Sequence, residues 1–260
     1  MGLNELLPKV TDPYERKARL WPALLALFPL IAMMELLYGA KLSALMNIAM
    51  LAISCGGLFL LTNICREIGK RLEPKLYREW GGKPTTQLLR HRDASIEGVT
   101  KLRYHSFLAG NINVPFPKPE DETINNIAAD DVYQSAVRWL LNQTRDTKKY
   151  ELLFQENITY GFRRNALGLK PFGLASALCS IIWILLACDV ITISSVYFIN
   201  KEALLALPET AIISLAGSLV MLLMWMLFFT KESVRTAAFT YAETLLRSCD
   251  TLNGKKLKED

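Results

Sequence analysis

A run of glycines, a lysine and two threonines occupies residues 81–86, and Arg90, His91 and Arg92 follow it closely. Glycines let a backbone approach an anion, the start of a following helix presents free N–H groups, and Lys and Arg supply positive charge. The run therefore predicts a phosphate-binding turn. It is not a P-loop, because the Gly-x4-Gly-Lys-Ser/Thr spacing and a preceding apolar strand are both missing.

Basic residues recur beyond this turn. Between residues 66 and 110 the chain carries ten Lys or Arg against five acids. We predict that Lys83, Arg90, His91, Arg92, Lys101 and Arg103 bind a ligand with several phosphates, such as an oligonucleotide. Tyr77, Trp80 and Tyr104 are candidates for stacking on bases. A second interpretation stays open, in which the basic residues meet lipid headgroups and the aromatic rings only pack.

The residues that metal or nucleophilic catalysis requires are scarce. The chain has two histidines and five scattered cysteines, and it lacks a Gly-x-Ser-x-Gly elbow. His91-Arg92-Asp93 matches a kinase tripeptide by letters only, since the other kinase motifs are missing. We expect no enzyme activity, no metal, no cofactor and no disulfide framework.

The candidate ligand-binding residues lie between apolar stretches of the chain. There are four such stretches, at about residues 20–38, 43–65, 171–198 and 211–230. Apolar residues make up 51% of the chain and the mean hydropathy is +0.20. Each stretch reaches the roughly 20 residues that cross about 30 Å of hydrocarbon. The sequence therefore predicts an all-α, polytopic membrane protein with four transmembrane helices in two hairpins.

Lys and Arg set the orientation of these hairpins. They cluster before residue 20, after residue 65, before residue 171 and after residue 230, whereas the two hairpin loops offer only Lys41 and Lys201. The positive-inside rule places both loops outside and both termini in the cytoplasm. The predicted segments are a cytoplasmic N-terminus (1–19), a hairpin (20–65), a helical ligand-sensing region (66–170), a second hairpin (171–230) and a cytoplasmic helix and tail (231–260).

Within the cytoplasmic region we predict four helical stretches. The first, 66–77, continues out of the membrane and breaks at 80–84. The second starts near residue 85 and runs past residue 102, a proline-containing loop covers 110–123, and further helices cover 124–142 and 147–157.

Polar residues inside the apolar stretches are candidates for a pore. Glu35 and Asp189 are the acids, and Asn47 and Asn63 add amides. A charge near the bilayer centre costs at least about 2.5 kcal/mol, so such residues normally face protein or water. Carboxylate rings around an oligomer axis would favour cations. Alternatively, both acids sit near the outer interface and reach headgroups, and the amides serve helix packing.

The four-span layout, the basic insert and the run Trp-Gly-Gly-Lys-Pro-Thr-Thr-Gln-Leu-Leu-Arg-His (80–91) resemble the membrane channel effectors of bacterial antiphage defence operons, most of all the channel of the Hailong system. The resemblance implies a homotetrameric channel in the bacterial inner membrane. It also implies that single-stranded DNA, made by a partner nucleotidyltransferase, holds the channel closed from the cytoplasm, and that opening depolarises the cell.

Two other functions compete with a channel. A secondary transporter would need coupled polar residues and broken helices near the middle of the membrane, for which Glu35, Asp189 and Pro29 give some support. A non-conducting scaffold would recruit a cytoplasmic partner. The identity of the ligand, its effect on the pore, the ion selectivity, the pore-lining helix and the subunit number stay open.

Overall fold

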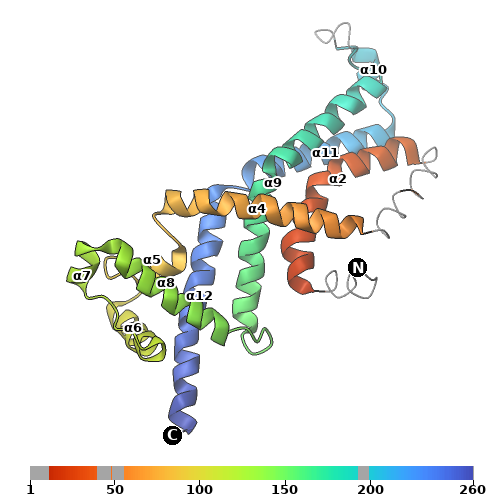
Figure 1. Ribbon diagram of the computed structural model, residues 1–260. Helices are drawn as coiled ribbons and strands as arrows, with labels where there is room; N and C mark the ends of the chain where they lie inside the picture. The colour runs from red at the N-terminus through yellow and green to blue at the C-terminus, as the bar shows by residue number, and fades with distance from the viewer. Residues whose placement is uncertain (1–11, 40–47, 49–55, 193–198, 260) are drawn as a thin grey trace. The chain divides into compact units, whose positions relative to one another are not determined.

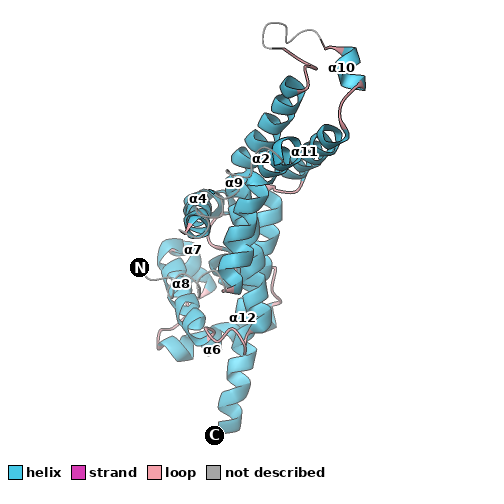
Figure 2. Ribbon diagram, turned by 90° about the vertical axis from the view of Figure 1, so that its right-hand side faces the viewer, coloured by secondary structure: helices cyan, strands magenta, loops and turns pink. Residues whose placement is uncertain are grey.

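Every regular element in the described part of the chain is helical. The computed structural model describes residues 12–39, 48, 56–192 and 199–259 (Figure 1). Figure 2, coloured by secondary structure, shows helices and loops and no strand within those ranges. The all-α fold class is thereby confirmed.

The chain packs as two compact units. Residues 1–72 and 161–234 form the first, which we call the apolar unit, and residues 73–160 and 235–260 form the second, the polar unit. Three helices, α4 (Gly57–Trp80), α9 (Glu151–Ala187) and α12 (Lys231–Glu259), contribute residues to both.

Three helices among the described residues are long and apolar enough to cross a membrane. The first is the continuous stretch Glu15–Tyr38, formed by a π-helix, η1 (Glu15–Leu20), and α2 (Trp21–Tyr38). The others are α9 and α11 (Glu209–Leu227). The short helix α10 (Lys201–Leu205) precedes α11. These helices match the predicted first, third and fourth spans.

The predicted second span lies mostly outside the described residues. Residues 43–47 and 49–55 of it, with Asn47 among them, are not described, and α4 begins only at Gly57. The count of candidate spans is therefore three for the described chain, where the sequence predicts four.

The predicted end of the third span was wrong. We expected helix to residue 198, but α9 ends at Ala187 and residues 193–198 lie outside the description. Asp189 takes a left-handed conformation with φ of 56°. The N–H of Val190 bonds to Leu185 O at 2.9 Å and that of Asp189 to Leu186 O at 3.1 Å. This Schellman motif ends the helix, and Asp tolerates the required backbone angle better than most residues do.

Large apolar side chains on the apolar unit face outward. On α11, Ile212, Ile213, Val220, Leu227 and Phe228 are all more than half exposed, whereas Ala211, Ser214 and Ser218 are buried. Helices that associate in lipid bury small residues and leave large apolar side chains to the hydrocarbon.

Glycines allow close helix crossings inside this unit. A Cβ on Gly173 of α9 would lie 2.2 Å from the Trp225 ring of α11. A Cβ on Gly69 of α4 would lie 1.9 Å from Asn165 Oδ1 of α9. Asn165 is fully buried and donates to Ala18 O at 2.7 Å. These contacts fix the spacing of helices within the apolar unit.

Short helices build most of the polar unit. They are α5 (Pro84–Leu89), α6 (Gly98–Ile112), α7 (Pro119–Ile124) and α8 (Asn126–Gln143), which lie together in Figure 1, and the long α12 (Lys231–Glu259) adds its later part. Helix α8 matches the predicted 124–142 helix. The predicted helix from residue 85 past 102 is two helices, because Arg90 is extended and the turns after it interrupt the chain. The predicted 110–123 loop is shortened by α6 and α7.

Capping residues and a separate core explain these local folds. Pro84 and Pro119 stand in the first turns of α5 and α7, where a missing N–H costs nothing. Asn125 caps α8 by accepting from Ala128 N at 3.1 Å. Leu89, Leu108, Tyr133, Leu140, Leu245 and Leu246 are fully buried in one cluster.

Candidate ligand-binding site

The glycine turn makes room for Arg90. Gly81 and Gly82 have φ of 85° and 132°, which other residues rarely adopt. A Cβ on Gly82 would lie 2.9 Å from Arg90 Nη2, and Arg90 Nη1 donates to Gly81 O at 2.9 Å. The positive group that approaches this turn most closely is therefore the protein's own arginine.

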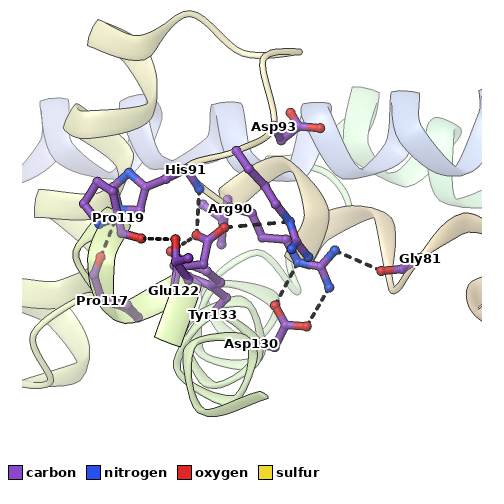
Figure 3. A network of polar contacts seen from close by, with 12 residues as sticks. Gly81, Arg90, His91, Asp93, Pro117, Pro119, Glu122, Asp130 and Tyr133 are labelled. Carbon is purple, nitrogen blue, oxygen red and sulfur yellow. Dashed lines mark hydrogen bonds and ion pairs between the residues drawn. The ribbon is translucent and has the colours of Figure 1, made fainter. Parts of the chain in front are cut away.

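Arg90 is the centre of a buried polar network (Figure 3). Its Nε and Nη2 atoms donate to the two carboxylate oxygens of Asp130 on α8, at 2.8 and 2.6 Å. Arg90 is only 8% exposed, and this hydrogen-bonded pair raises the pKa of its guanidinium. The two-pronged geometry holds α5 to α8 and uses the donors that a phosphate would need.

Lys101 is also buried and bonded to the protein's own backbone. It is 5% exposed, and its Nζ donates to Arg90 O at 2.7 Å and to Asp93 O at 2.5 Å. Burial lowers the pKa of this ammonium, while the Asp93 carboxylate opposes the shift. Lys101 thus satisfies the carbonyls of the turn that follows α5.

Two histidines and Glu122 extend the network. His91 N donates to Glu122 Oε2 at 2.8 Å, and the His91 ring meets Pro117 O at 2.9 Å. Tyr133 donates to the same Glu122 oxygen at 2.9 Å. The buried His105 ring meets Leu89 O at 2.7 Å, and burial lowers its pKa to about 4.

Lys83, Arg92 and Arg103 remain at the surface. Lys83 Nζ donates to the neutral Gln134 at 2.8 Å. The Arg92 side chain is 57% exposed and lies 3.9 Å from Glu122. Arg103 forms an exposed two-pronged pair with Asp250, at 2.8 and 3.1 Å. Of the six predicted ligand residues, Arg90 and Lys101 are buried, His91 is half-buried and the other three are exposed. Their binding of a ligand stays a prediction.

A cavity beside Lys83 escaped the sequence analysis. Its volume is about 230 Å³, and it lies within the polar unit. Tyr77, Tyr160 and Tyr241 line it, together with Lys83, Arg138 and Thr86. These residues come from α4, α5, α8, α9 and α12, so no local spacing could have brought them together. The sequence pointed to this place only through Tyr77 and the 81–86 run.

The polar residues predicted for a pore differ in exposure and in hydrogen bonding. Glu35 is exposed near the end of α2, and Asp189 is exposed in the turn after α9. Asn63 donates to Phe59 O within α4, at 3.0 Å. Whether Glu35, Asp189 or Asn63 lines a pore stays a prediction. Among the described residues, no three His, Cys, Asp or Glu side chains gather as a metal site would require.

Fold and site together define an all-α protein in which helices fit to cross a membrane are joined to a polar helical unit with its own core and cavity. Comparison with models of protein families, with curated proteins and with solved structures gave no match.

Proposed function

We propose that this chain is one subunit of an oligomeric ion channel in the bacterial inner membrane, controlled by an anionic ligand on its polar unit. The outward-facing apolar side chains of α11 support a lipid environment for the apolar unit. Four spans per chain are too few to enclose a wide aqueous pore, so the pore forms between subunits, which we propose to be four.

The proposed topology has four spans and places the polar unit and both termini in the cytoplasm. The predicted second span, residues 43–65, is retained in this proposed topology. Exposed cations flank the apolar helices, with Arg16 and Lys17 before α2 and Lys70 and Arg71 on α4. A cytoplasmic location for these cations follows the positive-inside rule.

The observation that carries the proposal is the origin of the cavity walls. Tyr77 belongs to α4 and Tyr160 to α9, and each of these helices contributes residues to both units, as α12 with Tyr241 also does. The hydroxyls of Tyr77 and Tyr160 both donate to Glu73 Oε1, at 3.0 and 2.6 Å, and they lie 3.1 Å apart. A ligand that alters this junction would act on both helices and so bias a two-state pore.

The proposed ligand is an oligonucleotide, with single-stranded DNA favoured, and the exposed Lys83, Arg92 and Arg103 are its phosphate contacts. The chain would then be the membrane effector of an antiphage system, paired with a nucleotidyltransferase that makes the signal, and its opening would depolarise the cell.

Charge reversal at exposed cations tests the ligand. We expect Lys83→Glu combined with Arg92→Glu to weaken binding of a single-stranded oligonucleotide and to flatten the salt dependence, because two phosphate contacts are lost. Reversal at Arg90 is unsuitable, since it would break the buried pair with Asp130. Lys148→Glu, at an exposed turn residue, is the matched control. Unchanged affinity in the double variant would remove the ligand part of the proposal.

Bilayer recordings test the channel. Purified chain in a planar bilayer should carry a current that the oligonucleotide changes reversibly. Solute uptake into vesicles without current would favour a secondary transporter. Absence of both current and uptake would favour a scaffold that recruits a cytoplasmic partner.

A further inference from the structure

Thr86 is a buried hydroxyl without a partner at the cavity wall. The residue is 2% exposed, and its Oγ1 atom has no hydrogen-bond partner among the described residues. Threonine in a helix normally bonds a carbonyl three or four residues earlier. Here Gly82 O accepts from the Gln87 side chain at 2.6 Å, and Lys83 O accepts from Gln87 N at 3.0 Å.

An unpaired buried hydroxyl is costly, so it calls for an explanation. Some buried hydroxyls in this chain are bonded, since Thr144 Oγ1 donates to Leu140 O at 3.0 Å and Ser180 Oγ donates to Ser176 O at 2.9 Å. Ser214 Oγ on α11, like Thr86 Oγ1, has no partner among the described residues. Thr86 lines a cavity of about 230 Å³. A molecule in the cavity would supply the missing partner.

The remaining cavity wall selects the chemistry of that molecule. Three tyrosines and apolar side chains such as Val137 and Leu245 offer flat, apolar surface. Lys83 and Arg138 are both exposed and supply positive charge, and among the described residues no Asp or Glu lines the cavity. The closest side-chain contact of Lys83 is the neutral Gln134. An anion would therefore meet two cations that no carboxylate of the cavity neutralises.

We infer that this cavity binds a small planar molecule carrying one anionic group. The ring packs against the tyrosines, a polar ring atom bonds Thr86 Oγ1, and the anionic group pairs with Lys83 and Arg138. The cavity volume lies below the range typical of drug-sized ligands, which restricts the occupant to a compact molecule. The inference rests on the proposed function only in treating the cavity as its control site.

Two sources share this chemistry: a nucleoside monophosphate and an aromatic carboxylate. Titration calorimetry on the full chain in detergent, with AMP and 4-hydroxybenzoate as separate probes, distinguishes them. Adenosine and inorganic phosphate are the controls that carry only the ring or only the charge. We expect one of the two complete probes to bind at least tenfold more tightly than either control.

Thr86→Val provides the decisive variant. Because the hydroxyl has no protein partner, its replacement by a methyl group should leave the melting temperature unchanged or higher. The same change should weaken binding of the preferred probe about tenfold, by loss of one hydrogen bond. A role confined to folding predicts the opposite pattern, with lower stability and unchanged affinity.

Arg138→Gln tests the anionic group without touching the interior. We expect it to weaken binding of the preferred probe and to reduce the salt dependence of that binding, whereas Arg145→Gln, at an exposed site outside the cavity, should do neither.

The inference is overturned if neither probe binds more tightly than its controls, or if Thr86→Val binds the preferred probe as tightly as the original chain does. Binding that responds to both variants, together with a current that ignores the probe, would uphold the inference and reject the cavity as control site.

Discussion

The two units differ in which small polar side chains their helices bury, although both bury large apolar ones, such as Trp225 in the apolar unit. In the polar unit, Leu108, Leu140 and Leu245 are fully buried, as water requires. On α11 of the apolar unit, Ser214 and Ser218 are buried while large aliphatic residues face outward. Helix α11 therefore combines buried serines with an aliphatic outer face, whereas the polar unit gathers leucines in its interior.

Buried polar groups differ in the same way. In the apolar unit, Asn165 and Ser176 donate to backbone carbonyls of η1 and α2, at 2.7 and 2.5 Å. Neutral donors avoid the cost of placing a charge in a low-dielectric region. The polar unit instead buries charged pairs, of which Arg90 with Asp130 is the clearest. A charged side chain is buried in the apolar unit too, since Arg164 is 7% exposed and its Nε donates to Asn165 Oδ1 at 3.2 Å. The difference is that the polar unit buries the ion pair of Arg90 with Asp130, whereas Asn165 and Ser176 of the apolar unit bond to helix backbones.

Gly173→Val should have the largest effect on this comparison. A Cβ at this position would overlap the Trp225 ring, with three ring atoms 2.2 to 2.6 Å away. We expect a loss of about 3 kcal/mol or more, because neither helix backbone can shift cheaply. Thermal unfolding in detergent measures it. Gly217→Val, where a Cβ meets nothing within 4 Å, is the control. Equal stability of the two variants would contradict small-residue packing of α9 on α11.

Asp130→Ala should destabilise the polar unit by about 3 kcal/mol, since it leaves Arg90 buried without its carboxylate. Its neighbour Asp131 is exposed, so Asp131→Ala should change stability by less than about 0.5 kcal/mol. Denaturant unfolding of both variants makes the comparison. A mild Asp130→Ala phenotype would mean that the network is not what holds α5 to α8.

Acid should weaken the polar unit through His105. Its pKa is about 4 in the fold and about 6.5 when exposed, so the unfolded chain binds the proton more readily. The His105 contribution is nearly complete above pH 6.5 and falls by about 3 kcal/mol as the pH drops to 4. His105→Gln should lose less stability than the original chain over this window. Parallel pH profiles would show that the histidine is not buried neutral.

Exposed charge pairs should matter least. Glu243→Gln removes an exposed ion pair with Arg247 one helical turn away on α12. We expect a cost of about 0.3 kcal/mol that disappears in high salt. Thermal melts at low and high salt measure the difference. A larger, salt-resistant loss would assign Glu243 a structural role that the described contacts do not explain.

Periodicity and composition predicted the helical class and the positions of α2, α8 and α11, because each carries a clear apolar pattern. They did not predict the end of α9 at Asp189, which depends on a left-handed backbone angle. They also did not predict the break between α5 and α6 after Arg90, whose side chain bonds to the distant Asp130. The cavity was not predictable, since Tyr160, Arg138 and Tyr241 are far apart in the chain. The burial of Lys101 was missed for the same reason, because its partners lie in a turn whose geometry depends on tertiary packing.

The most direct test of the central claim is a planar-bilayer recording of the purified chain with single-stranded oligonucleotide added to one side at a time. The account predicts a current that changes reversibly when the oligonucleotide is on the side of the polar unit and does not respond from the other side. A membrane that stays non-conducting with and without oligonucleotide, at protein densities sufficient for oligomers, would contradict it.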